Sequence, residues 1–368
     1  MSTFPVTLEA INQRIDALDV TAYAHTRNYL NGSVSRLSPY LSRGVVSLPY
    51  VMNRILQRAS VNDAQKFIYE LCWREYFQRI WFEQGNRIFS DFNNAQQPVK
   101  HHQMIKSVAD ATTGIEAIDQ GIQELYSTGY MHNHVRMYVA SIVTNVGQVH
   151  WHNPSKWMYY HLLDGDLASN SLSWQWVAGT FSSKKYFCNQ DNINTYGNTT
   201  QRDTFLDQSY EAVMRMNVPE VLQPVISPDL TTILPVVNSP LFDYNLPLLL
   251  YNSCNLDPLW RNEEPANRLL ILEPSYFNHY PVSANVMDFI LSLAYQINGL
   301  QIYIGEVNDI PALAAFPEIL SKEHPAFRHY PGIKDEPEWL FPSVNRVKGS
   351  FTSFWKACEK NLMQKHTP

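Results

Sequence analysis

The prolines of this chain are distributed very unevenly, and this limits where long helices can form. Of the 22 prolines, only five lie before residue 216 and 17 follow it. Proline removes a backbone hydrogen-bond donor and interrupts the interior of a helix. The first part of the chain can therefore hold long helices, whereas the second part mostly cannot. The run from Pro219 through Pro224 to Pro228 predicts a linker between them.

The spacing of apolar residues supports the same division. Residues 67–82 and 131–147 carry apolar side chains at helical intervals. Later in the chain, 269–272 and 302–304 have the character of buried strands, and the apolar stripe over 286–297 predicts an amphipathic helix between them. A strand–helix–strand unit favours a parallel sheet with a right-handed crossover.

The expected fold class is a mainly α-helical domain followed by a small α/β domain. The predicted ranges are 1–217 for the helical domain, 218–230 for the proline-rich linker and 231–368 for the α/β domain, whose role the sequence leaves open. A length of 368 residues fits two domains. With 45% hydrophobic and 17% charged residues, the chain can bury a core and is not predominantly disordered.

Cysteine and histidine placement argues against a disulfide framework and a metal site. The four cysteines lie far apart with no CxxC pair. His132/His134 and His150/His152 form HxH pairs, but helical residues two apart point in different directions and no third ligand has suitable spacing. We therefore expect no metal.

Two further absences concern the compartment. No apolar run reaches the ~18 residues that a spanning helix needs, and the N-terminus lacks the basic-then-apolar pattern of a secretory signal. We expect a protein that is not secreted and does not bind a membrane. Its compartment would be cytoplasmic, or nuclear in a eukaryote.

The net charge of −6 does not decide whether the chain binds nucleic acid. Residues 1–215 are balanced, with 18 basic and 18 acidic residues. Residues 216–368 hold 10 basic and 16 acidic residues and account for the whole excess. Phosphate binding depends on local basic clusters rather than on the total charge, so a DNA partner stays open.

A short hydroxyl-rich turn precedes Pro39. Ser33, Ser35 and Ser38 surround Arg36 in this turn. Hydroxyls, backbone N–H groups and a guanidinium suit a diphosphate, and the N-terminus of a following helix would add its dipole. Helix capping is the alternative, which explains one serine better than three with an arginine.

Two predicted helices each present polar or sulfur-containing groups at positions i, i+3 and i+4, and thus on one face. These faces could line a polar-edged pocket for a large planar ligand, or be solvated faces with salt bridges. The positions are Glu70, Trp73 and Arg74 in the first helix and Asn133, Arg136 and Met137 in the second.

An acidic turn at 164–166 is followed by clustered tryptophans. Asp164 and Asp166 flank a glycine, so they either form a turn and an N-cap or accept hydrogen bonds from a ligand's imide edge or from Arg136. Trp174 and Trp176 follow closely. Tryptophan rings usually either pack in a hydrophobic core or form a surface on which bases stack.

Taken together, these segments resemble the flavin-binding domain of the photolyase/cryptochrome family. The resemblance implies an α-helical domain that holds FAD in a folded conformation beside a cavity for a flipped-out DNA lesion. The matching text is SRLSPYLSRGVVS (35–47), ELCWREYF (70–77), YMHNHVRMYVASIVTN (130–145), and LLDGDLASN (162–170) with WQW (174–176). The family's N-terminal α/β antenna domain is expected to be missing, and a second antenna chromophore is unknown.

The resemblance also implies roles for individual residues. Those expected around FAD are Tyr23, Ser35, Arg36, Leu37, Ser38, Phe67, Glu70, Arg74, Asn133, Arg136, Asp164, Asp166 and Asn170. Those expected around a cyclobutane pyrimidine dimer are Glu70, Trp73, Asn133, Met137 and Trp176. Glu70, Asn170, Trp174 and Trp151 are the expected catalytic residues: Glu70 assists the dimer, Asn170 lies beside flavin N5, and the two tryptophans relay electrons.

The implied activity is light-driven repair of DNA by a carbon–carbon lyase. Excited, fully reduced FAD would pass an electron to the dimer, the ring would split, and the electron would return. The alternative is a photosensory flavoprotein similar to cryptochromes, which would signal through its C-terminal domain. One departure concerns the electron relay, because the family's third, surface tryptophan has no counterpart between residues 82 and 150.

Overall fold

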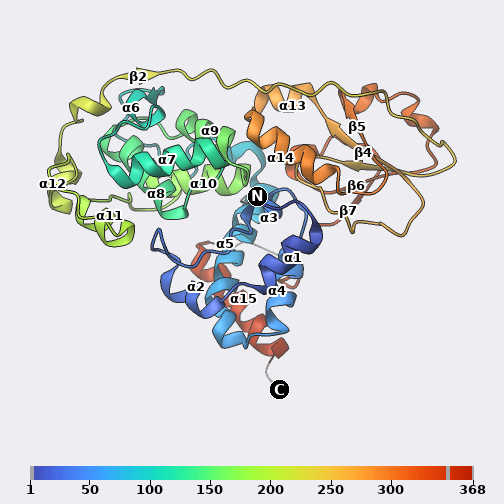
Figure 1. Cartoon of the computed structure of the whole chain (residues 1–368), viewed down its shortest axis with the longest axis horizontal. Helices are drawn as coiled ribbons and strands as arrows, with labels where there is room; N and C mark the ends of the chain where they lie inside the picture. Colours follow the sequence, from blue (N-terminus) through green and yellow to red (C-terminus); the bar gives the residue numbers. More distant parts are fainter. Residues whose placement is uncertain (1–3, 345–348, 367–368) are drawn as a thin grey trace. The chain divides into compact units, whose positions relative to one another are not determined.

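The computed structural model describes residues 4–344 and 349–366, and these fall into two compact units (Figure 1). The first unit, here called the sheet unit, comprises residues up to 18, 35–76 and 230 onward. The second, here called the helical unit, comprises residues 19–34 and 77–229. The break near residue 230 coincides with the end of the predicted linker. Independent folding of 1–217 and 231–368 stays a prediction.

The helical unit is built almost entirely of helices, as its few prolines predict. Its helices are α2 (Val20–Thr26), the second part of α5 (Val61–Gln84), η1 (Gly85–Phe89), α6 (Lys106–Ala109), α7 (Glu116–Thr128), α8 (Asn133–Ser141), η2 (Ile142–Val146), α9 (His152–His161), α10 (Leu167–Ala178), α11 (Gln190–Gly197), α12 (Tyr210–Arg215) and η3 (Glu220–Leu222). Two short strands, β1 (Met104–Ile105) and β2 (Val225–Ile226), pair antiparallel. The helices expected over 67–82 and 131–147 are confirmed, the second as α8 continued by the π-helical turn η2.

Local signals explain how α7, α8 and α10 begin and end. The Asp166 carboxylate caps α10 by accepting from Ser169 N at 2.7 Å. Gly129 ends α7 with φ of 71°, a left-handed conformation that favours glycine. A Cβ on Gly121 would lie 2.6 Å from Val135 Cγ1, so this glycine permits the close approach of α7 to α8. These helices thus position the 130–145 and 162–176 segments.

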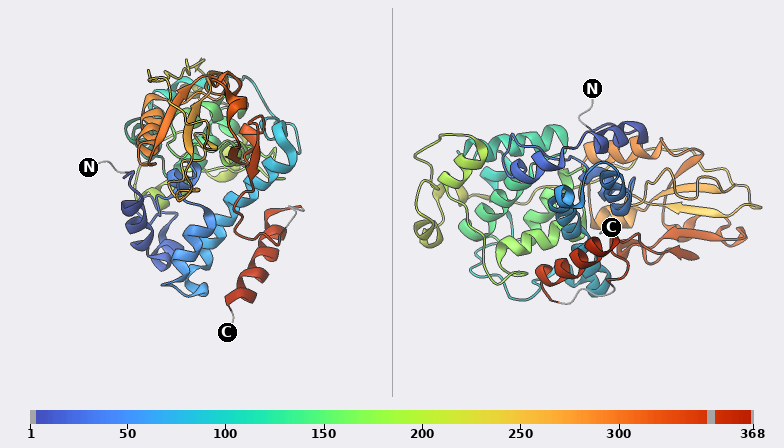
Figure 2. Two further views of the ribbon diagram at one scale, coloured as in Figure 1. Left: turned by 90° about the vertical axis from the view of Figure 1, so that its right-hand side faces the viewer. Right: turned by 90° about the horizontal axis from the view of Figure 1, so that it is seen from below.

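The sheet unit contains a parallel sheet, which is drawn in yellow-orange to red (Figure 2). It has five strands in the order β5-β4-β3-β6-β7. Its strands are β3 (Leu248–Tyr251), β4 (Asn267–Leu272), β5 (Leu300–Ile304), β6 (Ile319–Lys322) and β7 (Ile333–Asp335). All four residues of β3 are buried, as expected for a central strand of a parallel sheet. The predicted strand–helix–strand unit is confirmed, because β4 and β5 pair in parallel and α14 (Ala284–Ala294) lies between them in sequence. The remaining short helices of this region are α13 (Pro274–His279), η4 (Val307–Asp309), η5 (Leu313–Ala315) and η6 (Pro325–Phe327).

Segments from both ends of the chain complete the sheet unit. They are α1 (Leu8–Asp16), α3 (Ser38–Ser42), α4 (Leu48–Leu56), the first part of α5 and α15 (Phe351–His366). Arg43 O accepts from Leu256 N at 2.8 Å, and a Cβ on Gly44 would lie 2.3 Å from Cys254 O. Glycine at residue 44, with φ of 61°, is therefore required for this close backbone approach beyond β3.

Within the described part of the chain, none of the helices combines the length and apolar character needed to cross a bilayer.

His161, the last residue of α9, should make the stability of the protein fall in mild acid. Its ring lies 4.6 Å from Tyr126 and 6.0 Å from Trp157, and burial lowers its pKa from 6.5 to about 4. The unfolded chain therefore binds a proton before the folded chain does, and stability is lost as the pH falls from 6.5 towards 4. His161→Phe should remove about 3 kcal/mol of this loss, measured by urea unfolding at several pH values. An unchanged pH profile in this variant would contradict the prediction.

Candidate functional site

A buried ion pair joins α8 to the turn before α10. Arg136 Nη2 lies 3.1 Å from Asp164 Oδ1 and 2.9 Å from Oδ2, and Arg136 Nε donates to Met131 O at 2.8 Å. The Asp164 side chain is only 4% exposed and that of Arg136 is 22% exposed. The arrangement fixes the orientation of the Arg136 guanidinium, and it shows that Asp164 accepts from Arg136.

Asp166 has a different role from Asp164, although both are buried. Its Oδ1 caps α10 and its Oδ2 accepts a hydrogen bond from Gln78 Nε2 on α5. In the first turn of α10, Ser169 Oγ is buried and has no hydrogen-bond partner within the described ranges. A buried hydroxyl without a partner is unusual in a protein, so this turn retains hydrogen-bonding capacity for water or a ligand.

The two asparagines predicted for the site have different surroundings. Asn133 is exposed at the start of α8, and its Nδ2 lies 3.9 Å from Met137 Sδ one turn later. Asn170 Nδ2 donates to Ser155 O on α9 at 2.9 Å. Asn133 and Met137 therefore share one accessible helix face, whereas one amide hydrogen of Asn170 is used to hold α10 against α9.

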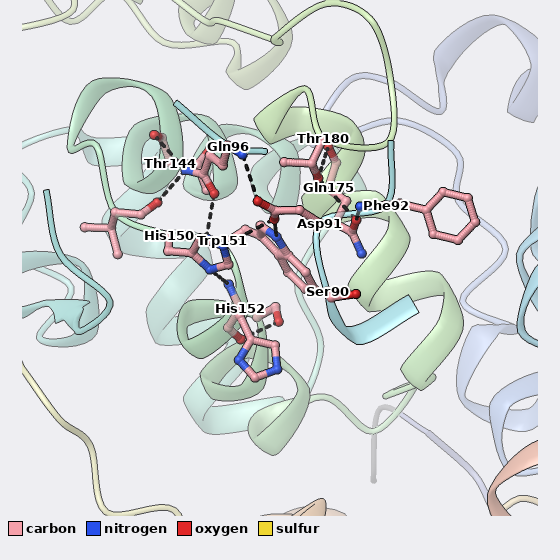
Figure 3. A network of polar contacts seen from close by, with 12 residues as sticks. Ser90, Asp91, Phe92, Gln96, Thr144, His150, Trp151, His152, Gln175 and Thr180 are labelled. Atoms are coloured by element: carbon pink, nitrogen blue, oxygen red, sulfur yellow. Dashed lines mark hydrogen bonds and ion pairs between the residues drawn. The ribbon is translucent and has the colours of Figure 1, made fainter. Parts of the chain in front are cut away.

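Three predicted tryptophans differ in their exposure and in their hydrogen bonds. Trp174 is buried, and its Nε1 has no hydrogen-bond partner among the residues that the structure describes. Trp151 is fully buried, and its Nε1 donates to Asp91 Oδ1 at 2.7 Å (Figure 3). Trp176 is exposed and its ring lies 5.9 Å from that of Tyr186.

Asp91 is the centre of a polar network that the sequence analysis did not find. His150 Nε2 lies 3.2 Å from Asp91 Oδ1, and Gln96 N donates to Asp91 Oδ2 at 2.8 Å (Figure 3). Burial lowers the pKa of His150, and Asp91 acts in the opposite direction. Asp91 belongs to no motif and lies 60 residues from Trp151, so no local signal could have found it.

The hydroxyl-rich turn leads into α3; its residues Ser35, Arg36 and Ser38 belong to the sheet unit, whereas Ser33 belongs to the helical unit. Ser35 Oγ accepts from Leu37 N at 3.4 Å, and Arg36 has φ of 50°. Helix α3 spans only five residues and its N-terminus has no side-chain cap. The expected helix therefore follows the turn, but so short a helix aligns few peptide units and its dipole is weak. Binding of a diphosphate here stays a prediction.

The face of α5 in the sheet unit packs against the C-terminal helix. The ring of Trp73 stacks on Phe351 of α15, with centroids 3.6 Å apart and planes at 12°. Tyr69 meets the same Phe351 edge-on at 5.0 Å. One turn away, Glu70 Oε1 pairs with Lys66 Nζ at 2.9 Å. Trp73 was predicted to contact substrate, and the sequence did not indicate that α15 covers it.

The predicted site residues are divided between the two compact units. Tyr23, Asn133, Arg136, Met137, Trp151, Asp164, Asp166, Asn170, Trp174 and Trp176 lie in the helical unit, and Ser35, Arg36, Leu37, Ser38, Phe67, Glu70, Trp73 and Arg74 lie in the sheet unit. Among residues 4–344 and 349–366, no group of three or more His, Cys, Asp or Glu side chains could hold a metal ion.

The helical unit combines a buried acid–guanidinium pair, a buried hydroxyl that has no hydrogen-bond partner among the described residues, and two buried indoles. The family model described as the FAD binding domain of DNA photolyase matches residues 67–224. The predicted resemblance to the photolyase/cryptochrome family is therefore confirmed over this region, as is the fold class of a helical FAD-binding-type domain with an α/β part.

Relatives of known name match part of the chain. Deoxyribodipyrimidine photo-lyase of Streptomyces griseus is 32% identical over 155 residues, which cover 40% of this chain and 32% of the relative. Cryptochrome DASH of Danio rerio is 32% identical over 176 residues, covering 45% and 33%. The chain therefore spans about a third of the length of these relatives. A Synechocystis cryptochrome structure is 24% identical with a TM-score of 0.47, covering 53% of this chain and 44% of that one.

Proposed function

We propose that this protein uses light and reduced FAD to split cyclobutane pyrimidine dimers in DNA, as a carbon–carbon lyase. The observation that carries the proposal is the match of residues 67–224 to the FAD binding domain of DNA photolyase, which includes the Arg136–Asp164 edge. Relatives named deoxyribodipyrimidine photo-lyase at 32% identity support the same reaction class.

The residues of the helical unit fit the polar edge of a flavin. Asp164 and Asp166 are acceptors and Arg136 is a donor, as the imide edge of such a ring requires. Ser169 Oγ provides a buried hydroxyl without a partner in the described residues. Bound FAD would supply one-electron transfer on excitation by light. The residues assigned to hold it are Tyr23, Ser35, Arg36, Leu37, Ser38, Phe67, Glu70, Arg74, Asn133, Arg136, Asp164, Asp166 and Asn170.

The chain's own task toward substrate is to hold two stacked pyrimidines and to exclude water. Positioning of this kind removes much of the entropic cost of the reaction. Glu70 would hydrogen-bond the dimer and stabilise charge that develops on it. The other residues assigned to contact the dimer are Trp73 of the sheet unit and Asn133, Met137 and Trp176 of the helical unit, the tryptophans through their rings.

Repair is tested directly with purified protein and ultraviolet-irradiated oligothymidine. We expect the protein to contain flavin and, after reduction, to remove dimers under blue light but not in the dark. Protein that shows no flavin absorbance and takes up none on reconstitution would contradict the whole proposal. Flavin-containing protein that fails to remove dimers would contradict repair alone.

A photosensory role is the second candidate, and one contact favours it. Phe351 of the C-terminal helix stacks on Trp73, the ring that repair would leave open to the dimer. In a photosensory protein, stacking of Phe351 on Trp73 would let helix α15 respond to a light-induced change near Trp73. Light-dependent protease sensitivity of α15, in protein that binds flavin without repairing DNA, would support this role.

Replacing Glu70 with alanine should slow repair while flavin stays bound. A hydrogen bond to a charged group contributes about 1.5–3 kcal/mol, so repair under limiting light should fall about ten- to hundred-fold. Lys66→Ala is the matched control, because it removes the ion-pair partner of Glu70 and leaves the carboxylate in place. Equal repair rates for Glu70→Ala and the wild type would contradict the role of Glu70.

A further inference from the structure

The indole of Trp151 is hydrogen-bonded directly to a base, the carboxylate of Asp91. Trp151 is fully buried at the N-terminus of α9, and its Nε1 donates to Asp91 Oδ1 over 2.7 Å (Figure 3). The Asp91 side chain is 23% exposed. Asp91 therefore gives the buried indole nitrogen of Trp151 a route to water. In the described part of the chain, the structure shows no such route for Trp174, the other tryptophan of the predicted relay.

Trp174, the other buried tryptophan of the predicted relay, differs from Trp151 in the surroundings of its indole nitrogen. It is also buried, but its Nε1 has no hydrogen-bond partner among the described residues. An oxidised indole is a much stronger acid than a neutral one, and it keeps its proton when no base is within reach. Of the two indoles, only Trp151 can lose its proton at once on oxidation.

The groups around Asp91 hold its carboxylate in position for this transfer. His152 N donates to His150 Nδ1 at 3.4 Å, so His150 carries its proton on Nε2, which faces Asp91 Oδ1 at 3.2 Å. Gln96 N donates to Asp91 Oδ2, and Gln96 Oε1 accepts from Trp151 N at 2.9 Å. Asp91 and Trp151 are thus fixed relative to each other by Gln96 as well as by their direct bond.

We propose that Asp91 accepts the Nε1 proton of Trp151, so that the electron relay ends at Trp151 as a neutral radical. The inference rests on the proposed function, because it requires bound flavin: when that flavin is in its oxidised form and excited by light, it would be the oxidant of Trp174. One electron passes from Trp151 to the Trp174 radical cation and restores neutral Trp174. The Nε1–H bond of Trp151 breaks, an O–H bond forms on Asp91, and the proton then leaves Asp91 for water.

This assignment explains how the relay works without a third tryptophan. No tryptophan lies between residues 82 and 150, so the positive charge has no surface indole of that segment to reach. Loss of the proton at Trp151 removes that charge and leaves an uncharged radical, which opposes return of the electron. Asp91 acts here as the proton acceptor of the relay.

Transient absorption after blue excitation of the flavin-loaded protein tests the inference. In the wild type we expect the spectrum of a neutral tryptophan radical, and slower formation of it in D2O than in H2O. In Asp91→Asn, which keeps an oxygen acceptor but is a far weaker base, we expect a radical cation and several-fold faster recombination. Asp110→Asn is the matched control, because Asp110 pairs with exposed Lys106 rather than with an indole.

The outcomes separate this inference from the proposed function. A wild-type protein whose final radical is the cation overturns the role of Asp91, and this measurement needs no variant to fold. A neutral radical in Asp91→Asn overturns it as well, while flavin photochemistry and repair stand. Failure to take up flavin instead overturns the proposed function, and the relay with it.

Discussion

Replacing Arg136 with methionine is expected to lower the free energy of unfolding by about 3 kcal/mol and to abolish flavin retention. The change leaves Asp164, whose side chain is 4% exposed, as a buried carboxylate without its guanidinium partner. Breaking a buried pair on one side costs about 3–5 kcal/mol, because the remaining charge stays desolvated. Urea unfolding and the flavin content of the purified protein measure the two effects.

Two matched variants show whether burial is the cause. Lys106→Met removes one partner of an exposed pair, Lys106–Asp110, and should change stability by less than about 1 kcal/mol. Adding Asp164→Asn to Arg136→Met should restore part of the lost stability, since the buried charge that has lost its guanidinium partner is then removed. If Arg136→Met were as stable as Lys106→Met, the buried Arg136–Asp164 pair would contribute no more to stability than an exposed pair.

Replacing Phe351 with alanine is the second change with a large expected effect. Phe351 stacks on Trp73 at 3.6 Å, so its removal should expose the indole and raise affinity for dimer-containing oligothymidine several-fold. The reason is that the chain and the substrate compete for the same ring face. Fluorescence anisotropy with irradiated and unirradiated oligonucleotide measures the change, and specific binding to the irradiated form is required.

Phe354→Ala is the control for this experiment. Phe354 is buried on the same helix α15 and its ring lies 5.5 Å from Tyr76. Both variants remove a phenyl group from the α5–α15 packing, so a general loosening of α15 would affect them alike. Weaker dimer binding in Phe351→Ala than in the wild type would contradict competition and indicate that Phe351 helps to form the pocket.

The sequence predicted those features that depend on short-range patterns. The helix over 67–82 followed from apolar spacing, and the β4–α14–β5 unit followed from two strand-like runs around an amphipathic stripe. The Arg136–Asp164 contact was one of the alternatives that residue chemistry allowed. The helix expected after the hydroxyl-rich turn forms as α3, but the sequence did not indicate that it would span only five residues.

Contacts between distant residues required the tertiary structure. Asp91 and Trp151 are 60 positions apart, and no sequence pattern links the two residues. Phe351 reaches Trp73 from the far end of the chain, and residues up to 18 and 35–76 cluster with the sheet rather than with the other predicted helices.

By itself, then, the amino-acid order determined the kinds of elements, the family resemblance and most candidate residues, because propensity, periodicity and motif spacing act over a few turns. Only the folded chain decided which base receives the Trp151 proton and which ring covers Trp73. Both depend on side chains that meet through the packing of separate elements, and burial and hydrogen-bond satisfaction are properties of that packing.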